Sequence, residues 1–175
     1  MSDSHTVHEF EVDPTANVGF VVFAWEKVEF TIEAAILELA GCPDYRARAF
    51  TTYMSFPSMW KAVRVLLKET DDFDSIKDDL KSLGYRIEKY RQLRNALVHA
   101  NWTGFYVNSE NPGISAEDYS ARNALTMKKL VFEHDKIREI GNDIWVLHEH
   151  LTKFFTDSCG LDPSGDKYQL PLLKT

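Results

Sequence analysis

The sequence predicts an all-α protein, an antiparallel bundle of four to five helices with a β-hairpin-like insertion between the last two long helices. Three observations predict this class. Apolar residues recur at alternating steps of three and four in several long segments, which is the period of one helix face. Glycine and proline follow the ends of these segments. Between the last two segments, aromatic and β-branched residues replace the helical pattern.

The first predicted helix begins near Pro14, because proline is accepted in a first helical turn. Gly41 and Pro43 are expected to end it. A second apolar stripe, seven residues apart, indicates that this helix packs against more than one neighbour; it comprises Phe23, Phe30 and Leu37. The main apolar face consists of Val18, Val21, Trp25, Val28, Ile32, Ala35 and Leu39.

Three further helical segments follow. One lies between residues 44 and 69, with a helix start near Ser55, and the next runs from about Ser75 to Asn101. The last runs from about Glu133 to Asp157 and is ended by Gly160. Gly84 is expected to permit a close helix approach. The apolar faces are Phe56, Met59, Trp60, Val63, Leu66 and Leu67, then Ile76, Leu80, Leu83, Ile87, Tyr90 and Leu97, and finally Ile137, Ile140, Ile144, Leu147, Leu151 and Phe154.

The whole chain, 1–175, is predicted to form one domain, because its length suits a single core. Residues 1–12 are predicted to be a flexible N-terminus and 160–175 a C-terminal tail. Residues 102–132 form the insertion, with strand-like sequence on both sides of Asn-Pro-Gly turn chemistry.

Composition limits the classes of function. The 175 residues carry a net charge of −7, which excludes a protein that coats nucleic acid by bulk electrostatics. The two cysteines, the polar N-terminus and the lack of a long apolar run predict a cytoplasmic protein without a disulfide scaffold, signal peptide or membrane span. Between residues 84 and 101 the charge balance reverses, with four cations (Arg86, Lys89, Arg91, Arg94) against Glu88.

Arg94 interrupts an apolar helix face, between Tyr90 and Leu97. Since burying an unpaired charge is costly, it needs an anionic partner, an interface or water. Taken alone, it is best explained as a buried salt bridge to the first helix, whose polar stripe contains Glu26, Glu29 and Glu33.

Asn95 and His99 change this interpretation. They are four residues apart and therefore share one helix face. A histidine exchanges protons near neutral pH, an asparagine can orient an imidazole or hold a phosphate oxygen, and an arginine matches phosphate geometry. Together with Arg94 they suit binding or attack on a phosphodiester, with His99 as base or acid and Arg94 stabilising the transition-state charge. No metal or cofactor is needed for this chemistry.

The helical geometry sets a condition on such a site. At about 100° per residue, Arg94 and His99 point about 140° apart. Either the helix distorts near its end or two copies of the chain pack face to face. We favour the second arrangement, a twofold homodimer with a shared cleft.

The segment Leu93-Arg94-Asn95-Ala96-Leu97-Val98-His99, late in a long helix of an all-α bundle, resembles the Arg-Asn-x-x-x-His motif of the HEPN domain family. The resemblance implies a dimer whose motif helices face each other across a positively charged cleft. It implies a metal-independent endoribonuclease of toxin–antitoxin or defence systems, with Arg94, Asn95 and His99 as catalytic residues. The RNA 2′-hydroxyl would attack, leaving a 2′,3′-cyclic phosphate and a 5′-hydroxyl.

The same resemblance leaves alternatives open. Some relatives carry, two residues after the histidine, a tyrosine that a partner nucleotidyltransferase modifies, whereas this chain has Asn101 there. Other relatives bind nucleotides or act as scaffolds, so a non-catalytic nucleotide-binding, RNA-binding or protein-interaction module is the rival hypothesis. RNA is the expected substrate, and an antitoxin or nucleotidyltransferase is a possible partner. A third hypothesis has the insertion, 102–132, bind another protein.

Four further residues are predicted to support the site or bind substrate: Arg91, Glu29, Glu33 and Trp102. The glutamates have a solvated helix face as their simpler explanation. Trp102 has two interpretations, a core residue at the helix–hairpin junction, which we favour, or a stacking surface for a base. His148 and His150 are two apart and face different ways, which does not suit a helical metal pair.

Overall fold

The computed structural model describes residues 14–42, 48–106, 113–120 and 126–163. The predicted N-terminal segment 1–12 and most of the tail, 160–175, lie outside these residues. Five α-helices and three strands form the described part, followed by one π-helical turn. They are α1 (Pro14–Leu39), α2 (Arg48–Thr51), α3 (Phe56–Lys68), α4 (Phe73–His99), β1 (Asn101–Tyr106), β2 (Gly113–Ser120), β3 (Thr126–Glu133), α5 (His134–Lys153) and η2 (Phe154–Ser158).

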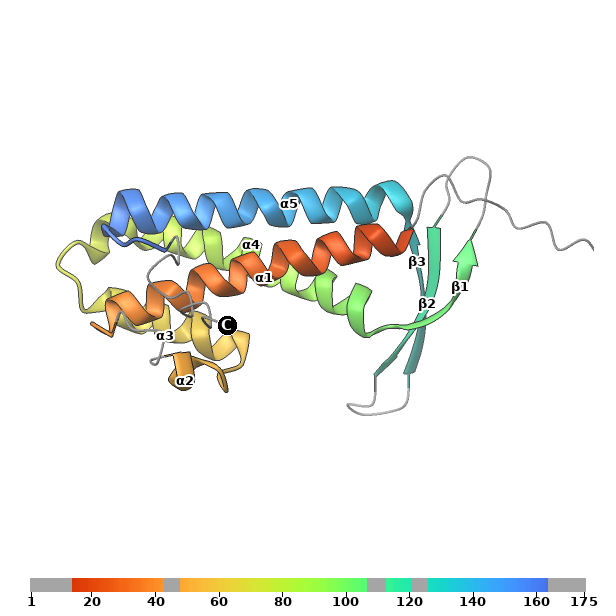
Figure 1. Ribbon diagram of the computed structural model, residues 1–175, viewed down its shortest axis with the longest axis horizontal. Helices are drawn as coiled ribbons and strands as arrows, with labels where there is room; N and C mark the ends of the chain where they lie inside the picture. The colour runs from red at the N-terminus through yellow and green to blue at the C-terminus, as the bar shows by residue number, and fades with distance from the viewer. Residues whose placement is uncertain (1–13, 43–47, 107–112, 121–125, 164–175) are drawn as a thin grey trace, which may run out of the picture.

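The helices form an elongated bundle with the small sheet at one end (Figure 1). The predicted fold class, a helical bundle with a strand insertion between the last two long helices, is confirmed. The neighbours α3 and α4, and α4 and α5, run antiparallel. In contrast, α1 and α5 run parallel, since Asn17 contacts His134 and Thr31 contacts His148, both at a sequence separation of 117 residues.

The core follows the predicted apolar faces. Trp25, Val28 and Ile32 of α1 are at most 1% exposed and face the equally buried Ile144 and Leu147 of α5 within one core cluster. Burial of such faces is the main source of stability for a helix in water. The helices therefore form where the period of three and four predicts them.

Helix ends also match the sequence signals. Gly41 has a φ of 67°, and the N–H of Cys42 donates to the carbonyl of Leu37 at 2.8 Å, which closes α1. Ser55 precedes α3, and Pro57 lies in its first turn. At the end of α4 the prediction is two residues too long, because Asn101 begins a strand.

The insertion is a three-stranded antiparallel sheet in the order β1-β2-β3, so the predicted hairpin lacks one strand. The missed strand, β2, pairs with β1 on one side and with β3 on the other. Gly113 lies in this strand opposite Glu133, and a side chain there would collide with the backbone carbonyl of Phe132, so the position requires glycine.

Among the residues that the structure describes, no helix combines the length and the apolar character that a bilayer crossing requires.

Candidate functional site

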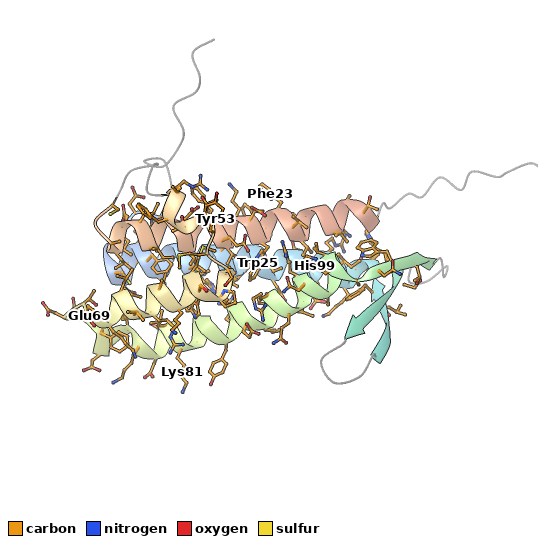
Figure 2. All side chains as sticks on the ribbon, turned by 90° about the horizontal axis from the view of Figure 1, so that it is seen from below. Phe23, Trp25, Tyr53, Glu69, Lys81 and His99 are labelled. Carbon is orange, nitrogen blue, oxygen red and sulfur yellow. The ribbon has the colours of Figure 1, made fainter. Side chains whose placement is uncertain are left out.

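The candidate site lies where the bundle meets the sheet. His99 is the last residue of α4, Ala100 has extended backbone with ψ of 146°, and Asn101 begins β1. The seven-residue segment from Leu93 therefore stays helical to its final residue. His99 is exposed at this end of α4, and Figure 2 labels it there.

The structure brings the three predicted catalytic residues together within one chain. Arg94 Nη1 donates to Asn95 Oδ1 at 3.1 Å and lies 3.4 Å from His99 Nε2. Because a guanidinium can only donate, the imidazole accepts through the lone pair of Nε2. The arrangement is a cation held between an amide oxygen and an unprotonated ring nitrogen.

This contact corrects the geometric condition derived from the sequence. A separation of about 140° around the helix does not keep Arg94 and His99 apart, because the long arginine side chain spans it while α4 remains helical. Convergence needs neither a distorted helix nor a second copy of the chain. A homodimer remains a prediction.

The salt bridge expected for Arg94 does not form. No ion pair among the described residues includes Arg94, and its Nε is buried without a hydrogen-bond partner. Tyr90 and Leu97, the neighbouring positions on this face, are 7% and 1% exposed, whereas Arg94 is only partly buried. A buried donor without a partner is rare in proteins and calls for an explanation such as a bound ion or a catalytic role.

The first-helix glutamates have other partners. Glu33 accepts hydrogen bonds from Arg48, at 2.8 Å from Nη2, and from the hydroxyl of Thr51, so it fixes α2 against α1. Glu29 accepts a hydrogen bond from the indole Nε1 of Trp25 at 2.6 Å. The predicted supporting role of Glu33 thus has a simpler structural explanation.

Glu29 nevertheless lies close enough to Arg94 to feel its charge. Burial raises the pKa of the Glu29 carboxyl above its usual value, and the charge of Glu26 adds to this. The Trp25 hydrogen bond and the Arg94 charge lower the pKa without reversing the shift. Desolvation therefore outweighs the attraction between Glu29 and Arg94.

Arg91 is held by its own helix. Its Nε and Nη2 both donate to the Glu88 carboxylate at 2.8 Å. These bonds and one from Gln92 lower the pKa of Glu88 to about 2, so the carboxylate stays ionised. Arg91 is thus less available to a ligand than the sequence suggests.

Trp102 occupies the core position that we favoured over a stacking surface. It is half-buried against the main core cluster. Its indole Nε1 donates to the carbonyl of Leu97 at 2.9 Å and so satisfies one of the last carbonyls of α4.

Each histidine of α5 contacts a side chain of another helix: His134 contacts Asn17, His148 contacts Thr31 and His150 contacts Arg86. The described residues contain no group of three or more side chains placed to hold a metal ion.

One feature was not predicted, a surface groove of about 680 Å³ between α3 and α4. Aromatic side chains and cations line it, with Arg64 and Lys68 on α3 and Lys77 and Lys81 on α4. Two cation pairs at a spacing of four residues, on consecutive helices, are the sequence signal that could have revealed it.

Comparison of the chain with protein-family models, with curated proteins and with solved structures gives no match.

Proposed function

We propose that this chain is a metal-independent endoribonuclease of the toxin or defence type, acting as a homodimer with a shared cleft. The observation that carries the proposal is the convergence of Arg94, Asn95 and His99 at an exposed helix end, with Arg94 Nε lacking a partner. The Arg94 guanidinium beside the His99 imidazole combines a cation with a proton-transferring ring, which suits a phosphodiester. The resemblance of this segment to the HEPN motif supports the same reaction.

In the proposed reaction His99 Nε2 takes the proton of the RNA 2′-hydroxyl. The 2′-oxygen then forms a bond to phosphorus while the bond from phosphorus to the 5′-oxygen breaks. The leaving oxygen takes a proton from the imidazolium of the second copy, which yields a 2′,3′-cyclic phosphate and a 5′-hydroxyl. Arg94 turns from Nε2 to the phosphate and stabilises the developing charge, and Asn95 Oδ1 orients the guanidinium.

Partner proteins follow from the same proposal. A toxin of this kind requires an antitoxin, which would cover the exposed end of α4. Modification by a nucleotidyltransferase at the position of Asn101 is not proposed, because an amide side chain lacks the hydroxyl that accepts a nucleotidyl group.

The test is RNA cleavage in the presence of EDTA by wild type, Arg94→Ala, Asn95→Ala and His99→Ala. We expect a loss of roughly 10²- to 10⁴-fold for His99→Ala and of about 10²-fold or more for Arg94→Ala. A matched control exists, because Arg86 Nη1 also contacts an imidazole, that of the exposed His150. Arg86→Ala and His150→Ala should cleave as wild type does.

Two outcomes would refute the proposal: a folded wild type that cleaves no RNA, or a His99→Ala variant as active as wild type. Light scattering at micromolar concentration tests the dimer separately. A monomer that cleaves RNA would remove the shared cleft and the proton transfer from the second copy, and would leave the roles of Arg94 and His99 within one chain.

A non-catalytic RNA-binding or nucleotide-binding module is the second candidate. It is favoured by the direct contact of Arg94 with His99 Nε2, because that contact occupies the lone pair that a general base needs. Binding of RNA that depends on Arg94, without any cleavage, would select this candidate.

A further inference from the structure

The groove between α3 and α4 combines flat aromatic surfaces with cations. Trp60 of α3 is half-buried and Tyr85 of α4 is 70% exposed, and both line the groove. The indole of Trp60 lies against the backbone of α4 because Gly84 has no side chain: a Cβ there would lie 3.2 Å from Nε1. Gly84 thus admits the indole of Trp60 beside α4, and both residues line the groove.

The charge of the groove differs from that of the chain. Four cations and two acids, Asp78 and Glu88, line it, whereas the chain carries −7. Glu88 is already bonded to Arg91, and Lys77 is paired with Asp74 at 3.0 Å. The three remaining cations form no ion pair within the described part of the chain; they are Arg64, Lys68 and Lys81.

The groove and two of the three candidate-site residues, Asn95 and His99, lie along one face of α4, whereas Arg94 leaves the helix on the side of Tyr90 and Leu97. Lys81 and His99 are 18 residues apart, as are Lys77 and Asn95, and 18 residues make five turns at about 3.6 residues per turn. Each pair therefore points in the same direction, about 27 Å apart along the helix. Figure 2 labels both residues: Lys81 lies in the first half of α4 and His99 at its C-terminal end.

We propose that the α3–α4 groove binds the single-stranded RNA that flanks the scissile phosphate. Bases stack on Trp60 and Tyr85, while Arg64, Lys68 and Lys81 contact successive phosphates. Stacking on aromatic rings together with backbone cations is the usual basis of single-strand binding. This inference rests on the proposed nuclease and extends its site along α4 by several nucleotides.

The experiment measures binding of a fluorescent single-stranded RNA to the full chain carrying His99→Ala, so that cleavage does not interfere. In this background, Tyr85→Ala should weaken binding by roughly 5- to 150-fold, the effect of losing one stacked base. Lys81→Gln should weaken it and should lower the slope of log K against log salt by about 0.7. Lys61→Gln is the matched control, because this exposed lysine lies on α3 outside the groove.

The outcomes separate the two proposals. If Tyr85→Ala and Lys81→Gln bind the RNA as tightly as the His99→Ala parent does, the groove proposal is wrong and the nuclease proposal is unaffected. Groove-dependent binding by a chain that never cleaves RNA would support the groove and remove the nuclease. The groove proposal would also be wrong if polyglutamate displaced the labelled RNA as well as unlabelled single-stranded RNA does, or if duplex RNA bound more tightly than single-stranded RNA. Neither polyglutamate nor a duplex offers unstacked bases.

Discussion

The indole N–H of Trp102 donates to the carbonyl of Leu97 across the end of α4, and His99 lies between these two residues. Trp102→Phe keeps most of the packing and removes the hydrogen bond. We expect a loss of about 1 kcal/mol in the free energy of unfolding, measured by urea denaturation. If the variant is as stable as wild type, the bond does not hold the helix end.

The contact of α1 with α5 at Gly141 can be tested with two glycines. A Cβ at Gly141 would lie 2.5 Å from Cδ1 of Phe20. Gly141→Ala should therefore cost about 1–2 kcal/mol, the overpacking penalty less the gain in helix propensity. At Gly19 of α1 a Cβ would meet nothing within 4 Å outside its own stretch of helix, so Gly19→Ala should gain up to about 1 kcal/mol. Equal gains from both would contradict this packing of the helices.

His148 makes stability depend on pH. Burial, and then the charge of Lys27, lower its pKa below the usual value, while Glu149 opposes the shift. The unfolded chain therefore binds more protons, so stability is fully present above about pH 6.5 and falls as pH drops through the folded pKa. His148→Asn keeps a polar group near Thr31 Oγ1 and cannot titrate. Its unfolding free energy should fall less than that of wild type between about pH 7.5 and 5.5; identical profiles would count against a buried neutral imidazole.

A substitution at Glu29 tests the absence of a structural ion pair between Glu29 and Arg94. The pKa of Glu29 is raised, so its contribution to stability is greatest below about pH 4.5 and is lost as pH rises through the folded pKa. Glu29→Gln can still accept from Trp25 Nε1 and removes the buried charge. It should be neutral or stabilising at pH 7, whereas a structural pair would make it destabilising. The exposed neighbour Glu26→Gln is the control, with an expected change within about 0.5 kcal/mol.

The helices were predictable because their burial follows a local period. Apolar steps of three and four placed Trp25, Ile32 and Leu147 on buried faces, and the structure buries all three. Gly41 likewise ends α1 through a local backbone conformation that the sequence signals directly.

The middle strand was not predictable in this way. The β2 sequence, Gly-Ile-Ser-Ala-Glu-Asp-Tyr-Ser, has no apolar alternation and contains residues that strands disfavour. It becomes a strand because it has a partner on each side, with Glu117 opposite Lys129 and Asp118 opposite Lys128. Such pairing depends on the rest of the sheet and leaves no local signal.

The candidate site was predictable in its residues and not in its contacts. Sequence spacing identified Arg94, Asn95 and His99, but directions taken from the helix axis ignored the length of the arginine side chain. Sequence spacing also could not show that Glu33 pairs with Arg48 and not with Arg94, because α2 and α1 come into contact only in the folded chain. The spacing of four residues places each pair of groove cations on one face of its own helix, but only the packing of α3 against α4 brings the two pairs to one groove.

The sheet is joined to the helix bundle almost without linker residues. Only Ala100 separates α4 from β1, and β3 passes directly from Glu133 into His134 of α5. Because no linker absorbs it, a displacement of the sheet is transmitted to the last turn of α4 and to the first turn of α5. A ligand that displaces the strands would therefore also displace the backbone that carries the imidazole of His99.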